Sequence, residues 1–430
     1  MSVHAPGQEP GGGPAHGQAA SWQSLTTTRR RWVVSAFGVC AFFAGGVALF
    51  SQYDPERLWG VTAACGYALA TLAALAWKSR GIDVALAAGL CGALLVPLAW
   101  MAWNGQGQPD VHVVARSAEL LIRHGTPYQG RGVLASATGP DAYDPYLPAM
   151  SFFALPLALT DHSPLGDPRV WFGVTFMVAF GAALSIAGAK DVARWSVFVA
   201  CSPIIALELA VGGTDVPIAA LLCLGFALLW ARPRTFAAGL AFGAAAALKA
   251  TAWPALALAL ILAATRDGRR AAAGLTATSL GVVAVLIGPF AVLRPGALVT
   301  NTVLFPLGLV KVKSPAASPL PGYLIAQTGY AGHLLTISLL MAGALAIGIS
   351  LIVKPLRTVP DAAVRLIIGL TLMIVLAPAT RFGYFLYPGC ILAWLVVSLL
   401  GRASRKVRAA EEPPPAGPEH RAPETWCPAP

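Results

Sequence analysis

Carboxylates and cations in polar segments between apolar runs are the residues of this chain best suited to chemistry. Asp110 stands between an apolar run and an amphipathic stretch, VHVVARSAELLIRHG. A carboxylate held there can accept a proton from a hydroxyl group, which is the role of a general base. Because Asp is also a preferred residue at helix N-termini, the residues alone leave two roles open for Asp110, base and helix cap.

Other polar side chains lie close to Asp110 in the sequence. His112 and Arg116 either face solvent at a membrane interface or place positive charge beside an anionic phosphate substrate. Asp144 and Tyr146 belong to the turn-rich segment DAYDPYLP, where Asp144 can form the turn, bind a sugar hydroxyl or bind a metal ion. One carboxylate without a D-x-D pattern supports a metal only weakly. We therefore assign no cofactor and leave a divalent cation open.

Three ionisable residues lie inside or beside apolar runs. Glu208 and Asp215 flank Gly212-Gly213 in ELAVGGTDVP, and Lys249 interrupts GAAAALKATAWP. Ionisable groups at membrane depth are unfavourable, so they usually face a cavity or a partner. We expect Asp215 to face a ligand, although it can also cap the next helix. Lys249 either snorkels to the interface or pairs with an anion such as a lipid phosphate.

The segments that position these residues are those of a membrane protein. Of the 430 residues, 57% are hydrophobic and 11% are charged, whereas soluble domains carry about 25% charged residues. Apolar runs of about 20 residues recur, and each is long enough to cross about 30 Å of hydrocarbon as a helix. The composition predicts an all-α polytopic membrane protein.

We predict about 12 transmembrane helices in this chain. They lie near residues 31–50, 57–77, 83–103, 169–189, 194–211, 214–231, 235–249, 251–265, 272–294, 333–353, 362–378 and 384–400. The short apolar stretch 148–159 is assigned to a juxtamembrane or re-entrant helix. In the alternative, 148–160 crosses the membrane and 235–265 forms one long helix.

Basic residues orient this bundle. They concentrate in loops that the 12-helix topology places on one side, which the positive-inside rule makes cytoplasmic. The net charge of +11 is then explained by basic residues that keep these loops on the cytoplasmic side. We expect no nucleic acid as a partner. Residues 1–28 form a disordered tail, 29–400 the transmembrane domain, and 401–430 a basic and then Pro-rich tail, with both termini cytoplasmic. We expect a multi-pass protein of the cell membrane.

This topology places two long segments, 104–147 and 295–332, outside, and loops of such length are usually functional or disordered. Lys311, Lys313 and Arg381 also remain outside, against the charge bias of the other loops. A phosphate ligand is the simplest reason for them. The first loop should converge with Asp215 and Lys249 on one outer face.

The order of these elements resembles the GT-C class of membrane glycosyltransferases, most closely the family 87 polyprenol-phosphate-mannose-dependent mannosyltransferases of actinobacteria. The resemblance rests on Asp110 followed by AELLIRHGTPY, DPYLPAMSFFALPLAL, GGTDVPIAALLCL and AAALKATAWPALALAL. It covers most of 104–265, and more loosely 295–332 and TRFGYFLYP. Two features depart from the usual pattern: Gly213-Thr214-Asp215 replaces a Gly-Gln, and three spans precede Asp110 where one is commoner.

The resemblance implies an inverting transferase in which Asp110, in the first large external loop, is the catalytic base. It implies a polyprenyl-phosphate-linked sugar donor, an envelope lipid or glycan acceptor, and surrounding membrane lipids as partners. The donor phosphate would be bound by Lys249, Arg381, Lys311 and Lys313, and the sugar or acceptor by Asp215, Asp144, Tyr146, His112 and Arg116. A rival function is a transporter or flippase of lipid-linked envelope intermediates, whose ionisable residues should line a path through both leaflets. A third possible function is that of a non-catalytic protein of envelope assembly.

Overall fold

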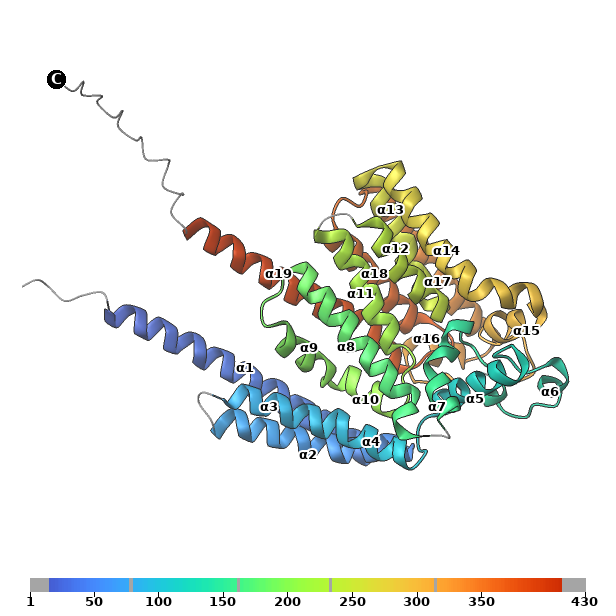
Figure 1. The fold of residues 1–430 in the computed structure, drawn as a ribbon, viewed down its shortest axis with the longest axis horizontal. Helices are drawn as coiled ribbons and strands as arrows, with labels where there is room; N and C mark the ends of the chain where they lie inside the picture. Colours follow the sequence, from blue (N-terminus) through green and yellow to red (C-terminus); the bar gives the residue numbers. More distant parts are fainter. Residues whose placement is uncertain (1–14, 77–79, 161–162, 232–233, 313–314, 412–430) are drawn as a thin grey trace, which may run out of the picture.

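The computed structural model describes residues 15–76, 80–160, 163–231, 234–312 and 315–411. Within these ranges the chain is helical apart from its loops, and its only extended pairing is an isolated bridge between Ala317 and Thr380. The long helices pack into one bundle (Figure 1). The predicted all-α polytopic membrane fold is confirmed.

Eight helices among the described residues are long and apolar enough to cross a membrane. Each combines at least 18 residues with high hydropathy, so its backbone groups are satisfied within the helix while its side chains face apolar surroundings. They are α1 (Ala15–Phe50), α2 (Asp54–Ala76), α3 (Gly81–Leu90) continued into α4 (Val96–Trp103), α8 (Pro168–Ala187), α14 (Arg269–Leu293), α17 (Tyr330–Val353), α18 (Val359–Leu376) and α19 (Leu386–Glu411).

A bent helix pair follows α8. α9 (Val192–Ala200) and α10 (Pro203–Val211) meet at 63°, which makes them a broken span or a re-entrant loop. The bend falls at Pro203, because proline lacks the N–H that would continue the preceding helix and disfavours helical backbone in the residue before it. The predicted span 194–211 is therefore not one straight helix.

Three shorter apolar helices come next, α11 (Val216–Ala231), α12 (Thr235–Leu248) and α13 (Trp253–Leu262). They have 16, 14 and 10 residues, fewer than the roughly 20 that an upright span needs. The predicted total of about 12 spans counts the bent pair and these three short helices as spans, and it stays a prediction.

Two hydrophobic cores hold the bundle together. The first four helices form their own core around Trp59, Tyr67 and Met101, which continues onto α10. Their backbones approach closely: a Cβ on Gly66 would lie 2.6 Å from the Cα of Gly92, the kind of contact that small residues permit between membrane helices. A larger core joins α8, α11, α12, α13, α18 and α19.

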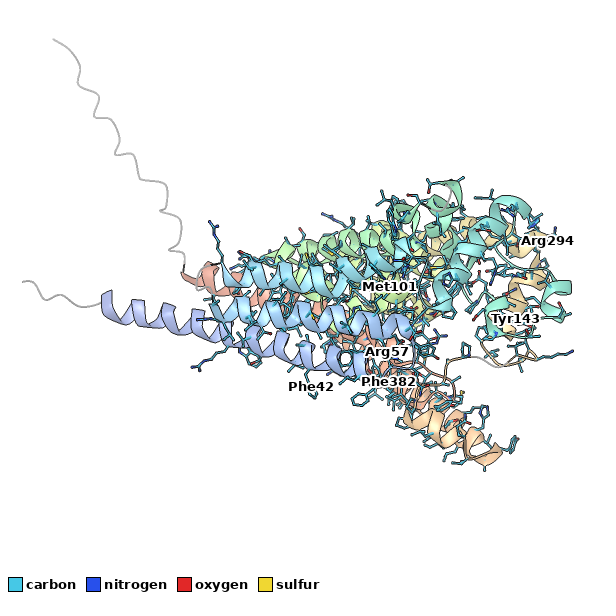
Figure 2. All side chains as sticks on the ribbon, turned by 90° about the horizontal axis from the view of Figure 1, so that it is seen from below. Phe42, Arg57, Met101, Tyr143, Arg294 and Phe382 are labelled. Atoms are coloured by element: carbon cyan, nitrogen blue, oxygen red, sulfur yellow. The ribbon has the colours of Figure 1, made fainter. Side chains whose placement is uncertain are left out.

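Short helices gather at one end of the bundle, which we call the α5 end. They are α5 (Pro109–His124), α6 (Arg131–Ala135), α7 (Leu155–Leu159), α15 (Pro295–Val299) and α16 (Pro321–Ala326). Figure 1 shows them at the right, opposite the start of α1 and the end of α19, and Tyr143 and Arg294 mark the same end in Figure 2. The two long predicted loops, 104–147 and 295–332, thus fold together, and the rings of Tyr143 and Phe305 stack at 4.7 Å between them.

α5 forms where the amphipathic stretch was predicted. Val111, Val113 and Val114 are buried, while His112 is exposed. The helix ends at Gly125, whose φ of +67° suits a glycine that closes a helix. The next apolar stretch is a 3-10 helix, Pro148–Ala154, followed by five-residue α7, too short a segment to cross a membrane upright.

Both predicted tails differ in part from the structure. α1 already begins at Ala15, inside the segment 1–28, and α19 continues to Glu411, past the predicted boundary at 401. Residues 1–14 and 412–430 lie outside the described residues. The predicted sidedness of the two termini stays a prediction.

Candidate active site

Asp110 lies in the first turn of α5 and is one half of an ion pair. Its Oδ2 accepts a bond of 2.5 Å from Nη1 of Arg381, and its Oδ1 accepts one of 2.6 Å from the hydroxyl of Tyr146. The extended residue that precedes the helix is Gln108, so Asp110 is not its N-cap. The cap role is therefore excluded, although a carboxylate in the first turn still interacts favourably with the helix dipole.

A second ion pair lies between Asp215 and Lys249, 2.7 Å apart. Asp215 directly precedes α11, and Lys249 follows α12 with extended backbone, which interrupts the helical run 235–262 at this point. The hydroxyl of Tyr387 also donates to Oδ1 of Asp215, at 2.6 Å, and lies 2.6 Å from the hydroxyl of Thr251. The Asp215 pair is thus built into a hydrogen-bonded network.

Aromatic rings connect the two pairs. Nζ of Lys249 lies 5.3 Å from the ring centre of Tyr146 and 5.1 Å from that of Tyr384, within the range of cation–π attraction. Because Tyr146 also donates to Asp110, one side chain contacts both pairs. Burial, together with Asp110, raises the pKa of Tyr146 well above its usual value, so its hydroxyl remains a donor at neutral pH.

Asp144 supports this arrangement from behind Tyr146. It is 5% exposed, and its carboxylate accepts bonds from the Ser117 hydroxyl at 2.6 Å and the Tyr146 backbone N–H at 2.9 Å. Its own N–H donates to Asn301 of the second long loop. Burial raises the pKa of Asp144 to about 7, although these donors and Arg116 oppose the rise. The position favours a supporting role over direct contact with a sugar.

Arg116 packs beside Asp144 and donates from Nη2 to the backbone carbonyl of Asp141, at 2.5 Å. Its Nε is buried and has no hydrogen-bond partner among the described residues. Burial lowers the pKa of Arg116, while Asp144 and Asp141 oppose the shift. Arg116 therefore belongs to the Asp144 side of the loop, one step removed from the two ion pairs.

Two of the other predicted site residues lie elsewhere. His112 lines a cavity of about 510 Å³ with Asp54, Trp100 and Gln106, between α5 and the first helices. Lys311 is exposed and forms no ion pair with a described residue, and Lys313 lies outside the described residues. The structure thus brings Asp110, Asp215, Lys249, Arg381 and Tyr146 together, but not Lys311.

The sequence did not single out Tyr384, Tyr387 and Thr251 as site residues. The two tyrosines lie in TRFGYFLYP at the start of the last apolar run, where aromatic residues are typical of a membrane interface whatever their function. The nearby Arg381 was the available signal. Among the described residues, no three His, Cys, Asp or Glu side chains group in a way that could hold a metal ion.

Comparison with known proteins gives one family. No curated protein and no solved structure matches the chain. The model of glycosyltransferase family 87 matches residues 145–378, more than half of the chain, from the loop before Tyr146 to the end of α18. The match includes Asp215 and Lys249, which form the second ion pair at the α5 end. This membrane protein therefore belongs to glycosyltransferase family 87.

Proposed function

We propose that this glycosyltransferase inverts the anomeric carbon as it moves a hexose, with mannose the expected sugar, from a polyprenyl phosphate to an envelope glycolipid or glycan outside the cell membrane. Asp110 is the general base of this reaction. Arg381 and Lys249 bind the phosphate of the donor. The proposal combines the family with the geometry of the two ion pairs.

The surroundings of Asp110 suit a base. Its side chain is 19% exposed, so a hydroxyl group can approach it, and each carboxylate oxygen accepts one bond from the protein while keeping a second acceptor position. Tyr146 and Arg381 hold the carboxylate in one orientation. A fixed orientation lets the acceptor bind in a geometry that can react.

The cations suit a departing phosphate. Nη1 of Arg381 is used by Asp110, while its other N–H groups donate to no described residue, and a guanidinium group can serve two oxyanions at once. Nζ of Lys249 gives one of its three donors to Asp215. Two cations beside the base can stabilise the negative charge that develops on the leaving group.

The reaction balances with these groups alone. Asp110 takes the proton of the acceptor hydroxyl, whose oxygen forms a bond to the anomeric carbon as the bond from that carbon to the phosphate oxygen breaks. The electron pair of the broken bond leaves with the polyprenyl phosphate. The attack comes from the face opposite the leaving group, so the configuration inverts.

The setting of the site supports a lipid-linked donor. The two ion pairs lie among membrane helices, and the sequence contains no Gly-rich nucleotide-binding motif. A lipid-linked sugar reaches such a site from the bilayer. The observation that carries the proposal is the Asp110–Arg381 pair, which places a held carboxylate beside an available cation.

The transporter alternative gains no support. The buried charged residues in the described part of the chain, Asp144, Asp167, Arg169 and Asp215, lie on or beside the segments of the α5 end. A path through both leaflets would need such residues along the bundle.

The test uses purified protein, polyprenyl-phosphate-mannose and an extract of envelope lipids. We expect a new mannosylated glycolipid with inverted anomeric configuration, identified by mass spectrometry and NMR. Asp110→Asn should lower kcat by about 10²- to 10⁴-fold, the usual effect of losing a general base. Asp141→Asn, which alters an exposed carboxylate of the same loop, should leave kcat unchanged. Full activity in Asp110→Asn contradicts the assignment of the base.

A further inference from the structure

Glu208 is a carboxylate near the ion pairs that the proposed mechanism does not use. It lies in the last turn of α10, whose sequence PIIALELAV is otherwise apolar. A carboxylate near the C-terminus of a helix is repelled by the helix dipole, and a charge among apolar side chains is unfavourable unless it has a partner. Its presence there calls for a function.

The chain makes room for this side chain with two glycines. A Cβ on Gly213 would lie 2.7 Å from the Cβ of Glu208, and a Cβ on Gly383 would overlap the Glu208 carboxylate. The carboxylate therefore packs on the backbone of Gly383. In the sequence, Gly383 stands between Arg381, which pairs with Asp110, and Tyr384, which contacts Lys249.

Glu208 differs from the neighbouring carboxylates in having no partner. Its side chain accepts no hydrogen bond and forms no ion pair within the described part of the chain, and it is partly exposed. By contrast, Glu56 accepts bonds from Ser51 and Gln108. Asp215, Asp110 and Glu56 repel the charge of Glu208, and Arg381 attracts it. Open acceptor positions thus lie beside the proposed phosphate site.

The chemistry of these positions selects the ligand. The hydroxyl groups of a sugar ring both donate and accept hydrogen bonds, so they can pair with the two oxygens of a carboxyl group in either of its protonation states. Phosphate oxygens only accept, and an ionised carboxylate would repel them. In a polyprenyl-phosphate donor the sugar is bonded directly to the phosphate, so a carboxylate close to Arg381 is within reach of the sugar ring.

We propose that Glu208 binds ring hydroxyl groups of the transferred sugar and thereby determines which sugar the enzyme accepts. This inference rests on the proposed function. Glu208 holds the sugar ring through two hydroxyl groups while Arg381 holds the phosphate, and the two contacts fix the anomeric carbon opposite Asp110. A sugar that lacks one of these hydroxyls covers the Glu208 side chain but leaves it without that hydrogen bond, and a polar group left unpaired under a bound substrate is an effective basis for rejecting that substrate.

The experiment compares donors that lack single hydroxyl groups. Purified wild-type protein, Glu208→Ala and Glu208→Gln are assayed with polyprenyl-phosphate-mannose and with its 2-, 3-, 4- and 6-deoxy analogues. For wild type, we expect at least one deoxy donor to lower kcat/KM by about 10- to 100-fold, as for a hydrogen bond to a charged group. Glu208→Ala should lose a similar factor with the full donor and then treat that deoxy donor and the full donor alike.

Two controls make the result specific. Glu56→Gln alters a nearby carboxylate whose partners lie within the protein, so it should keep the wild-type ratio between full and deoxy donors. Glu208→Gln keeps the size of the side chain and carries the test if Glu208→Ala does not fold. Because an amide retains one acceptor oxygen, its discrimination should fall between those of wild type and Ala.

The outcomes separate the two proposals. If wild type transfers no sugar from any polyprenyl-phosphate hexose, the proposed function fails, and the role of Glu208 fails with it. If wild type is active but both Glu208 variants keep its full discrimination among deoxy donors, only the role of Glu208 is overturned. A merely structural Glu208 would lower activity equally with every donor and leave the ratios unchanged, which also overturns the inference.

Discussion

The two ion pairs at the α5 end have the same kind of partners but differ in how far they are closed off. The side chains of Asp110 and Arg381 are 19% and 31% exposed, whereas those of Asp215 and Lys249 are 9% and 12% exposed. Asp215 also accepts from Tyr387 on the same oxygen. We call Asp110–Arg381 the open pair and Asp215–Lys249 the closed pair.

Because of this difference in exposure, the open pair is suited to react with a substrate and the closed pair to hold the fold. A base needs access for the acceptor hydroxyl, and the open pair provides it, because part of each charged group still faces away from the protein. In the closed pair each charge depends on the other for compensation, since burial removes most of the water that would otherwise solvate it. The closed pair can thus fix the positions of α11 and α12 as well as the charge of Lys249.

The family match also separates the two pairs. Residues 145–378 include both members of the closed pair, while Asp110 precedes the match and Arg381 follows it. The open pair is therefore assembled from the two flanking segments of the chain. Tyr146, just inside the match, is the side chain that connects the pairs.

The largest effect on stability should come from breaking the closed pair. Lys249→Met leaves Asp215 buried without its cation, and Asp215→Asn leaves the cation without its anion, so each should lower the free energy of unfolding by about 3–5 kcal/mol. The double variant removes both charges and should regain most of that loss. Asp110→Asn, in the open pair, should change stability by about 1 kcal/mol or less.

Thermal and denaturant unfolding in detergent micelles measures these differences. Equal losses for Asp110→Asn and Asp215→Asn would remove the distinction between an open and a closed pair. A double variant no more stable than Lys249→Met would mean that the pair does not act as a unit.

A pH-dependent effect should come from Asp144, which supports the open pair through Tyr146. Burial raises its pKa to about 7, above about 3.9 in the unfolded chain. The folded protein then holds a proton that the unfolded chain has lost, so this contribution to stability is complete below about pH 4 and disappears as pH rises through about 7. The difference of about three units between the folded and unfolded pKa values corresponds to at most about 4 kcal/mol of stability.

Asp144→Asn cannot ionise and should remove that part of the pH dependence. Unfolding free energies of wild type and variant are compared at pH 5 and pH 8, where the wild type should lose more stability between the two values than the variant. Parallel curves for the two proteins would show that Asp144 does not change its protonation in this range.

The helical framework was predictable because its signal is local. An apolar run of about 20 residues determines a membrane helix regardless of what it packs against, and the long helices appear where such runs were found. The bend at Pro203 was not predicted, because hydropathy over a window reports composition and not where the backbone turns. α1 likewise extends back to Ala15 through residues that carry no apolar run.

The members of the site were partly predictable, but their pairing was not. Asp110, Asp215, Lys249 and Arg381 stood out because a charge beside an apolar run is unusual. Asp110 pairs with a residue 271 positions away, and Lys249 pairs with Asp215. Both pairings depend on helix packing, which no local sequence pattern encodes. Lys311 was chosen by its charge alone, and the structure leaves it exposed.

The smallest effect on free energy should come from exchanging one cation of the open pair for another. Arg381→Lys keeps the charge but loses the planar fork that can bind a carboxylate and a phosphate together. We expect kcat/KM for the donor to fall by about 10- to 100-fold, the loss of one charge-assisted hydrogen bond, while the unfolding midpoint stays near that of wild type. Arg294→Lys, an exposed arginine at the same end, is the matched control and should keep wild-type kinetics. If Arg381→Lys instead destabilises the protein as much as Lys249→Met, the open pair holds the fold just as the closed pair does, because an accessible pair would tolerate the exchange.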